Sequence, residues 1–113
     1  MDQINKNKKI VRDLIEYIAS IAPSSKDVEV QKIIDDVNGH YLMYSVGWEG
    51  MRWVYGSFVH IDVKPNGRVW VQHDGTDLRI ADDLAVRGIP KKNIVIGFQA
   101  PHARVLMEGF AAA

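Results

Sequence analysis

The chain has 113 residues, which suits a single domain over residues 1–113 that buries roughly 65% of its unfolded surface. Its 14 basic and 14 acidic residues cancel, which argues against a protein that holds duplex DNA by phosphate neutralisation alone. Cysteine is absent, which excludes disulfides, thiolate catalysis and cysteine zinc sites. The chain contains neither an apolar run of membrane-spanning length nor the apolar core of a signal peptide. We therefore expect a soluble, cytoplasmic protein with no membrane partner.

The first expected element is an amphipathic helix over residues 3–21. Apolar residues recur in this segment at three- and four-residue steps, with charged residues between them. Pro23 ends the helix, because a proline disfavours helical geometry in the residue before it. The basic residues of this helix suggest either a phosphate-binding patch or, as we prefer, a solvated face shared with Asp13 and Glu16. These basic residues are Lys6, Lys8, Lys9 and Arg12.

The next segment predicts three strands joined by hairpins. Residues 28–34 are rich in branched side chains, and Asn38-Gly39 follows, a pair that favours a tight turn because both residues tolerate positive φ. A second strand over about residues 41–48 turns at Glu49-Gly50 into a third strand over 52–63. The residue pattern does not decide whether this second turn holds two or three residues.

The turn between the third and fourth strands sets a register. Residues 64–68 suit a three-residue loop, with a type I turn followed by Gly67 in the left-handed conformation. This loop collects the branched apolar residues of both strands on one side of the sheet. The expected cross-strand pairs are Val63 with Val69, Ile61 with Val71, and Val59 with His73.

A second helix and a short strand complete the expected fold. Thr76 is expected to cap a helix over residues 77–87, which Gly88 ends. A fifth strand over residues 94–98 follows, and the conformation beyond Pro101 stays open. The order predicts an α+β fold: an antiparallel four-stranded meander sheet with an N-terminal helix, a second helix after strand four and a short fifth strand. The helices should lie on one face of the sheet.

One polar group invites a metal or acid–base hypothesis. His60 and Asp62 point to the same side of the third strand, and the expected register brings Asp74 beside them. We prefer a structural role, because the set lacks a close second histidine and Asp74 precedes a glycine in a turn. His40 and His102 are expected to be exposed and inert. We therefore expect no catalytic residue, no metal and no cofactor.

Aromatic residues concentrate in one stretch, with all three tryptophans falling within about 23 residues. Core packing and a contact with a partner both remain open for these rings, because the first helix covers only one face of the sheet. A spare aromatic face and an unpaired sheet edge also favour a homodimer. The candidate partner-binding residues are Trp48, Trp53, Tyr55 and Trp70.

Three segments resemble a known family in their residues and in their order along the chain. They are SVGWEGMRWVYG at 45–56, HIDVKPNGRVWVQHDGT at 60–76 and GIPKKNIVIGF at 88–98. Together they resemble the XisI family of fdxN-element excision controlling factors, over nearly the whole chain. The resemblance implies a cyanobacterial accessory factor that works with a protein partner, XisH, when a serine-type recombinase excises a DNA element.

On this basis we favour a non-enzymatic controlling factor that acts through an XisH-like protein and a recombinase complex, and that reaches DNA only indirectly. Two alternatives remain. The chain could bind DNA weakly by itself, although its neutral charge counts against this. It could also be a small hydrolase that uses His60, Asp62 and Asp74.

Overall fold

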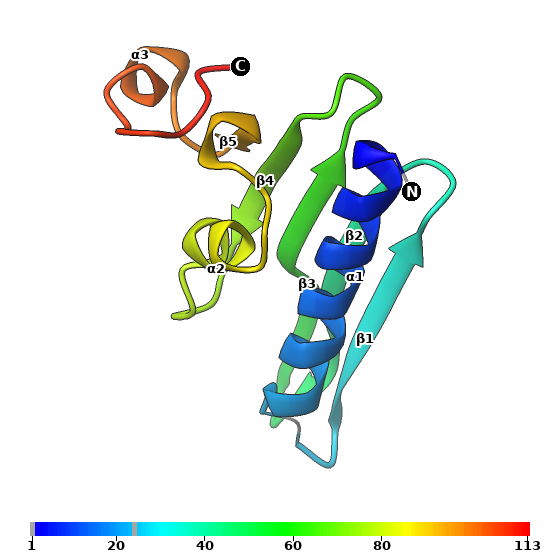
Figure 1. Cartoon of the computed structure of the whole chain (residues 1–113). Coiled ribbons are helices and arrows are strands. Elements are labelled where there is room, and N and C mark those ends of the chain that lie inside the picture. The colour runs from blue at the N-terminus through cyan, green and yellow to red at the C-terminus, as the bar shows by residue number, and fades with distance from the viewer. Residues whose placement is uncertain (1, 24) are drawn as a thin grey trace.

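The computed structural model describes residues 2–23 and 25–113. Five strands form one sheet in the order β1-β2-β3-β4-β5. Helix α1 lies across β1, β2 and β3, and α2 packs beside it against β4 and β5 (Figure 1). The elements in chain order are α1 (Gln3–Ile21), β1 (Val28–Asp35), β2 (His40–Glu49), β3 (Arg52–Val63), β4 (Val69–Asp74), α2 (Ile80–Val86), the 3₁₀ turn η1 (Lys91–Asn93), β5 (Ile94–Ile96) and α3 (Pro101–Arg104).

The predicted α+β fold is confirmed, with an N-terminal helix, a four-stranded meander, a helix after strand four and a short fifth strand. The first helix has the predicted bounds. Asp2 caps its start by accepting a hydrogen bond from the Asn5 backbone N–H at 2.8 Å, and Ala22 adopts extended geometry ahead of Pro23. Strand β5 is shorter than expected and runs parallel to β4, because α2 carries the chain back across the sheet between them.

The β3–β4 register is partly as predicted. Ile61 pairs with Val71, and Val63 with Val69, as expected, but Val59 lies opposite Asp74 and not His73. That last pair was wrong because the register shifts by one residue between His60 and Ile61, which makes Gln72 the extra residue of a β-bulge on β4. Both branched residues at the shift, Val59 and Ile61, stay buried on the helix side.

The two hairpin turns differ from each other in length. The predicted turn at Asn38-Gly39 forms, but Asp35 pairs with His40, so the loop holds four residues. Gly39 occupies the left-handed region at φ 75°, and a Cβ there would lie 2.3 Å from the Val63 carbonyl oxygen. The open question at the second turn is resolved by the pairing of Glu49 with Arg52, which leaves a two-residue loop.

The predicted cap of the second helix was wrong. Helix α2 begins at Ile80, and Thr76 lies in the loop before it. The Asp74 carboxylate organises this loop: it accepts hydrogen bonds from the Thr76 hydroxyl at 2.6 Å and from the Ile80 backbone N–H at 3.0 Å. Thr76 is thereby held by Asp74 and accepts from the Leu78 N–H, so it cannot act as the helix cap. Gly88 ends the helix as predicted, with φ 121°.

The core lies between the two longer helices and one side of the sheet. The C-terminal segment, whose conformation the sequence left open, forms α3 and returns to pair Ala111 with Val95 along the edge of β5. Among the described residues, no helix is long and apolar enough to span a membrane. The buried apolar residues of α1 and α2 are Val11, Leu14, Ile15, Ile18, Ile80 and Leu84, and those of the sheet include Tyr41, Met43, Val59, Ile61, Val69 and Val71.

Candidate functional site

The sheet face turned away from α1 carries a row of aromatic side chains. Strand alternation and the Trp48–Trp53 cross-strand pair place both indoles on this face, with their ring centroids 5.4 Å apart. Tyr55 stacks on Trp53 at 6.5 Å with an interplanar angle of 9°, and Tyr44 approaches Tyr55 at 5.6 Å. We call these four residues, Tyr44, Trp48, Trp53 and Tyr55, the aromatic strip.

The aromatic strip is exposed although its rings pack on one another. Trp48, Trp53 and Tyr55 remain 56%, 50% and 66% exposed. Ile33 and Leu42 continue the apolar surface along β1 and β2, because they pair with each other on the same face. Large contiguous apolar surfaces are uncommon on monomeric proteins and mark contact sites. The aromatic strip is therefore a candidate protein-binding surface.

Trp70, the fourth aromatic residue proposed for partner binding, lies apart from the aromatic strip. Trp70 lies on β4, pairs with Asp62 of β3 and is half-buried. The Arg104 guanidinium lies over its ring, 5.1 Å from the ring centroid. Arg104 is held in place by donating hydrogen bonds to the Gln99 and Gly97 carbonyl oxygens. The structure thus brings three of the four predicted residues together and uses the fourth to seat the C-terminal segment.

A polar cluster lies farther along the same face. Asp62 is 5% exposed, and its Oδ1 accepts hydrogen bonds from His40 Nδ1 at 2.7 Å and from His60 Nε2 at 2.8 Å. Gln72 Nε2 donates to Asp62 Oδ2 at 3.2 Å. Burial alone would raise the pKa of Asp62, but the hydrogen bonds from His40, His60 and Gln72 together lower it below the ordinary value. We call His40, His60 and Asp62 the His–Asp cluster.

The His–Asp cluster differs in membership from the predicted group. Asp74 was expected beside His60 and Asp62, but it faces the helix side and is engaged with the loop before α2. This removes the two-carboxylate arrangement that the hydrolase hypothesis needs. His40, expected to be inert, takes its place because it pairs with Asp62 across β2 and β3.

The second histidine was missed because a β-bulge moves it. The register between β2 and β3 shifts between Met43 and Tyr44, where Phe58 is the extra residue on β3. If the register of the hairpin tip continued without this shift, His40 would face Ile61 and not Asp62. The only signal in the sequence is the pair Phe58-Val59, two adjacent apolar residues that break the alternation expected of a strand with one buried face.

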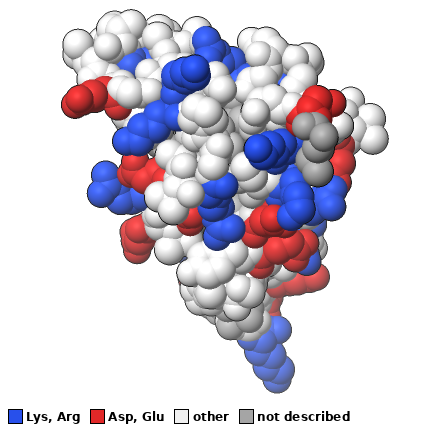
Figure 2. Space-filling view, viewed as in Figure 1, with Lys and Arg blue, Asp and Glu red and all other residues white. Residues whose placement is uncertain are grey.

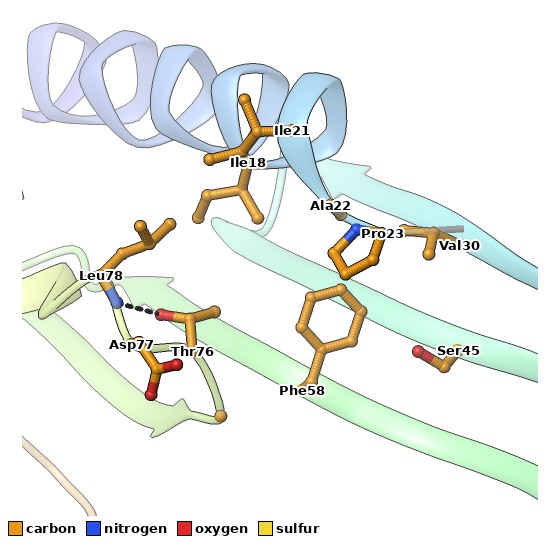
Figure 3. A pocket seen from close by; sticks show the side chains of 11 residues that line it. Ile18, Ile21, Ala22, Pro23, Val30, Ser45, Phe58, Thr76, Asp77 and Leu78 are labelled. Carbon is orange, nitrogen blue, oxygen red and sulfur yellow. Dashed lines mark hydrogen bonds between the residues drawn. The ribbon is translucent and has the colours of Figure 1, made fainter. Parts of the chain in front are cut away.

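An apolar groove opens on the helix side, at the C-terminal end of α1. Its volume is about 410 Å³, and it lies between this helix end, β2, β3 and the loop over residues 75–78 (Figure 3). Phe58 points from β3 toward Pro23 in this groove, and Ile18 from α1 and Leu78 from the loop also line it. Among the described residues that line it, Asp77 is the sole ionisable one, so the groove suits an apolar ligand by shape and contact and offers little for catalysis.

Two of the four basic residues named on α1 contact carboxylates. Lys9 pairs with Asp13 at 2.8 Å, and Arg12 contacts Asp36. Acidic and basic side chains are interspersed over the helix-covered side of the molecule (Figure 2). This arrangement supports the solvated helix face and weakens the phosphate-binding alternative.

Comparison with known proteins decides the family. The family model described as XisI protein matches residues 1–112. The chain belongs to the XisI family. The crystal structure of a XisI-like protein from Anabaena variabilis ATCC 29413 is 36% identical, with a TM-score of 0.89 over 96% of this chain and 98% of that chain. That of the fdxN element excision controlling factor XisI from the same organism is 31% identical, with a TM-score of 0.87 over 99% of this chain and 100% of that chain. No curated protein matches.

The resemblance inferred from three segments is thereby confirmed at the level of the XisI family. In this XisI-family chain, the segment over 45–56 forms the hairpin tip with most of the aromatic strip. The segment over 60–76 contributes His60, Asp62 and the bulged Gln72. The segment over 88–98 ends α2 and forms β5. Two of the three segments that carry the family likeness therefore contribute residues to the candidate surfaces of the open sheet face, while His40 and Tyr44 lie outside them.

Proposed function

We propose that this XisI-family protein is a non-enzymatic accessory factor that controls excision of a DNA element by binding a protein partner through its aromatic strip. The observation that carries the proposal is the exposure of Trp48, Trp53 and Tyr55 at the hairpin end of the sheet face turned away from α1. Family membership supports the excision role, since a 31% identical relative is named an fdxN element excision controlling factor.

A protein surface is a better occupant of the aromatic strip than DNA. Single-stranded DNA also stacks on exposed aromatic rings, but such sites combine these rings with a positively charged groove. At the tip of this hairpin the cation Arg52 is paired with Glu49 at 2.8 Å, and the chain as a whole is neutral. Tryptophan and tyrosine are enriched among the residues that dominate protein–protein binding.

The partner that we propose is an XisH-like protein, with the recombinase reached through it and DNA contacted only indirectly. A cytoplasmic location follows from this role. The competing occupant is a second copy of the chain, since β1 forms an edge of the sheet and the aromatic strip is self-complementary in its apolar character. A second copy that binds through the aromatic strip would exclude the partner, whereas one that binds along the β1 edge would leave the strip free.

Titration of the purified chain with an XisH-like protein, followed by calorimetry, tests the proposal. We expect micromolar or tighter binding, and Trp53→Ala and Tyr55→Ala should each weaken it at least about tenfold, as for central aromatic residues of an interface. The matched control is Val86→Ala, which removes an exposed apolar side chain from α2 on the opposite side. Absence of binding at micromolar concentration, or equal binding by all three variants, would contradict the proposal.

Light scattering of the chain alone separates the two occupants. A monomer that associates only with the XisH-like protein supports the hetero-complex. A dimer that Tyr55→Ala dissociates, together with no binding to the XisH-like protein, would assign the aromatic strip to self-association and contradict the accessory role stated here.

A further inference from the structure

The His–Asp cluster gathers three groups that commonly bind metals. His40 Nδ1, His60 Nε2 and an Asp62 carboxylate oxygen all lie within 4.8 Å of one another. They come from two adjacent, paired strands, so the backbone that carries them is held by the sheet ladder. The objection to a metal at the level of sequence was the lack of a second histidine, and His40 removes that objection.

The donor set suits one class of cation. Two imidazole nitrogens and one carboxylate oxygen are typical of Zn²⁺ and its neighbours Co²⁺, Ni²⁺ and Cu²⁺, whereas Mg²⁺ and Ca²⁺ prefer oxygen ligands. Both rings are partly exposed, with 47% of the His40 side chain and 33% of the His60 side chain accessible. A metal can therefore enter from solvent, and a water molecule can fill a fourth position.

The geometry needs only a small adjustment. The two nitrogens now stand 2.7 and 2.8 Å from Asp62 Oδ1 as hydrogen-bond donors. Ligand atoms around a tetrahedral Zn²⁺ stand roughly 3.3 Å apart, so each ring would retreat by about half an ångström. Each neutral ring would also carry its proton on the other nitrogen, on Nε2 of His40 and Nδ1 of His60, which frees the coordinating lone pair without net proton release.

The surroundings of Asp62 both support and limit binding. Gln72 donates to Oδ2 at 3.2 Å and so orients the carboxylate with Oδ1 toward the two rings, as partners beyond the ligands do in metal sites. Lys64 Nζ lies 3.9 Å from the same Oδ2, and its positive charge opposes a second cation nearby. Micromolar affinity is therefore expected, and not the tight binding of a structural zinc finger.

We propose that His40, His60 and Asp62 form a binding site for one divalent transition-metal ion of the zinc class. The ion would link the start of β2 to the end of β3, at the opposite end of this strand pair from the hairpin tip that carries Trp48 and Trp53. The site uses none of the residues of the aromatic strip. Its existence is therefore independent of the accessory function proposed above.

Calorimetric titration with ZnCl₂ tests the site, using the full chain without an affinity tag and after treatment with a chelator. We expect one ion per chain, a micromolar dissociation constant and a higher Tm in the presence of Zn²⁺, because an ion that binds only the folded state stabilises it. Titration with MgCl₂ should show no binding. Co²⁺ should give the visible absorption band of tetrahedral coordination.

Single-histidine variants decide whether the cluster is responsible. His40→Ala and His60→Ala should each weaken Zn²⁺ binding at least about tenfold, as loss of a ligand does, while circular dichroism checks that both variants fold. The matched controls are His73→Ala and His102→Ala, which remove exposed histidines outside the cluster and should leave binding unchanged. Absence of binding, or binding that the control variants reduce as much as the cluster variants, would overturn the proposal and leave a hydrogen-bond network alone.

Discussion

The two faces of the β2–β3 strand pair carry similar residues, but one face is buried and the other is exposed. On the helix side Tyr41 is buried against the core, and its hydroxyl donates to Asp36 at 2.7 Å. On the open side Tyr55 stacks on Trp53 but stays exposed. Apolar character alone thus does not separate the core from the exposed surface in this sheet. What separates them is whether a helix of the same chain packs on that part of the face.

Removing the buried tyrosine should have the largest effect. Tyr41→Ala deletes a fully buried aromatic ring, and such truncations cost about 3–5 kcal/mol of unfolding free energy through lost burial and the cavity left behind. Urea denaturation of the variant and the wild-type chain measures the difference. A loss below about 1 kcal/mol would mean that the helix-covered face does not hold the fold as described.

A second, smaller effect is expected in the loop before His40, where Gly39 packs closely against the end of β3. Gly39→Ala places a Cβ against the Val63 carbonyl in addition to a left-handed backbone, and we expect it to cost more than about 2 kcal/mol. Gly67→Ala is the matched control, since φ is also positive there but the space is open, so only the backbone cost of roughly 1–2 kcal/mol applies. Equal losses in the two variants, measured by urea denaturation, would contradict the close packing at Gly39.

The acid dependence of stability probes the polar part of the open face. The pKa of Asp62 is lowered in the folded chain, so its contribution is fully present above the ordinary carboxyl pKa and is lost as the pH falls through the folded value. Asp62→Asn should cost about 1–3 kcal/mol at pH 7 and lose less further stability on acidification than the wild-type chain.

Denaturation at pH 7 and pH 3 checks this, with His40, His60, Gln72 and Lys64 left in place around the site. The pKa of Asp35 is also lowered, by hydrogen bonds from Asn38, so part of the acid sensitivity should remain in the variant. An unchanged pH dependence in Asp62→Asn would show that the ionised carboxylate does not stabilise the fold.

The smallest effect on stability is expected on the aromatic strip. Tyr55→Ala should change the unfolding free energy by at most about 1 kcal/mol, since the side chain is largely exposed and loses mainly its contacts with Tyr44 and Trp53. The same variant is expected to lose partner binding, so stability and binding should separate. A loss comparable with that of Tyr41→Ala would mean that the strip is part of the core and not a free surface.

Local patterns in the sequence predicted most of the fold. The bounds of α1 follow from its apolar spacing and from Pro23, and the hairpins follow from their glycines. The start of α2 was predicted too early, because Asp74 competes for the Thr76 hydroxyl. The orientation of β5 depends on how the chain returns over the sheet, which no window of residues encodes.

The candidate surfaces were likewise predicted in part from the sequence and decided in part by tertiary structure. The concentration of tryptophan and tyrosine around one hairpin was visible in the residues themselves, and so was the likeness to the XisI family. Which rings stay exposed was decided by tertiary structure, since Arg104 reaches Trp70 from α3 while no helix of the described residues reaches Trp53.

The sequence by itself determined the order of elements, their approximate bounds and the family, because these depend on apolar periodicity, turn residues and sequence motifs shared with the family. Only the tertiary structure decided that His40 meets Asp62 and that Asp74 does not. The physical reason is the pair of β-bulges at Phe58 and Gln72. One extra residue in a strand turns every later side chain to the other face, and whether a strand accepts it depends on packing against the helices.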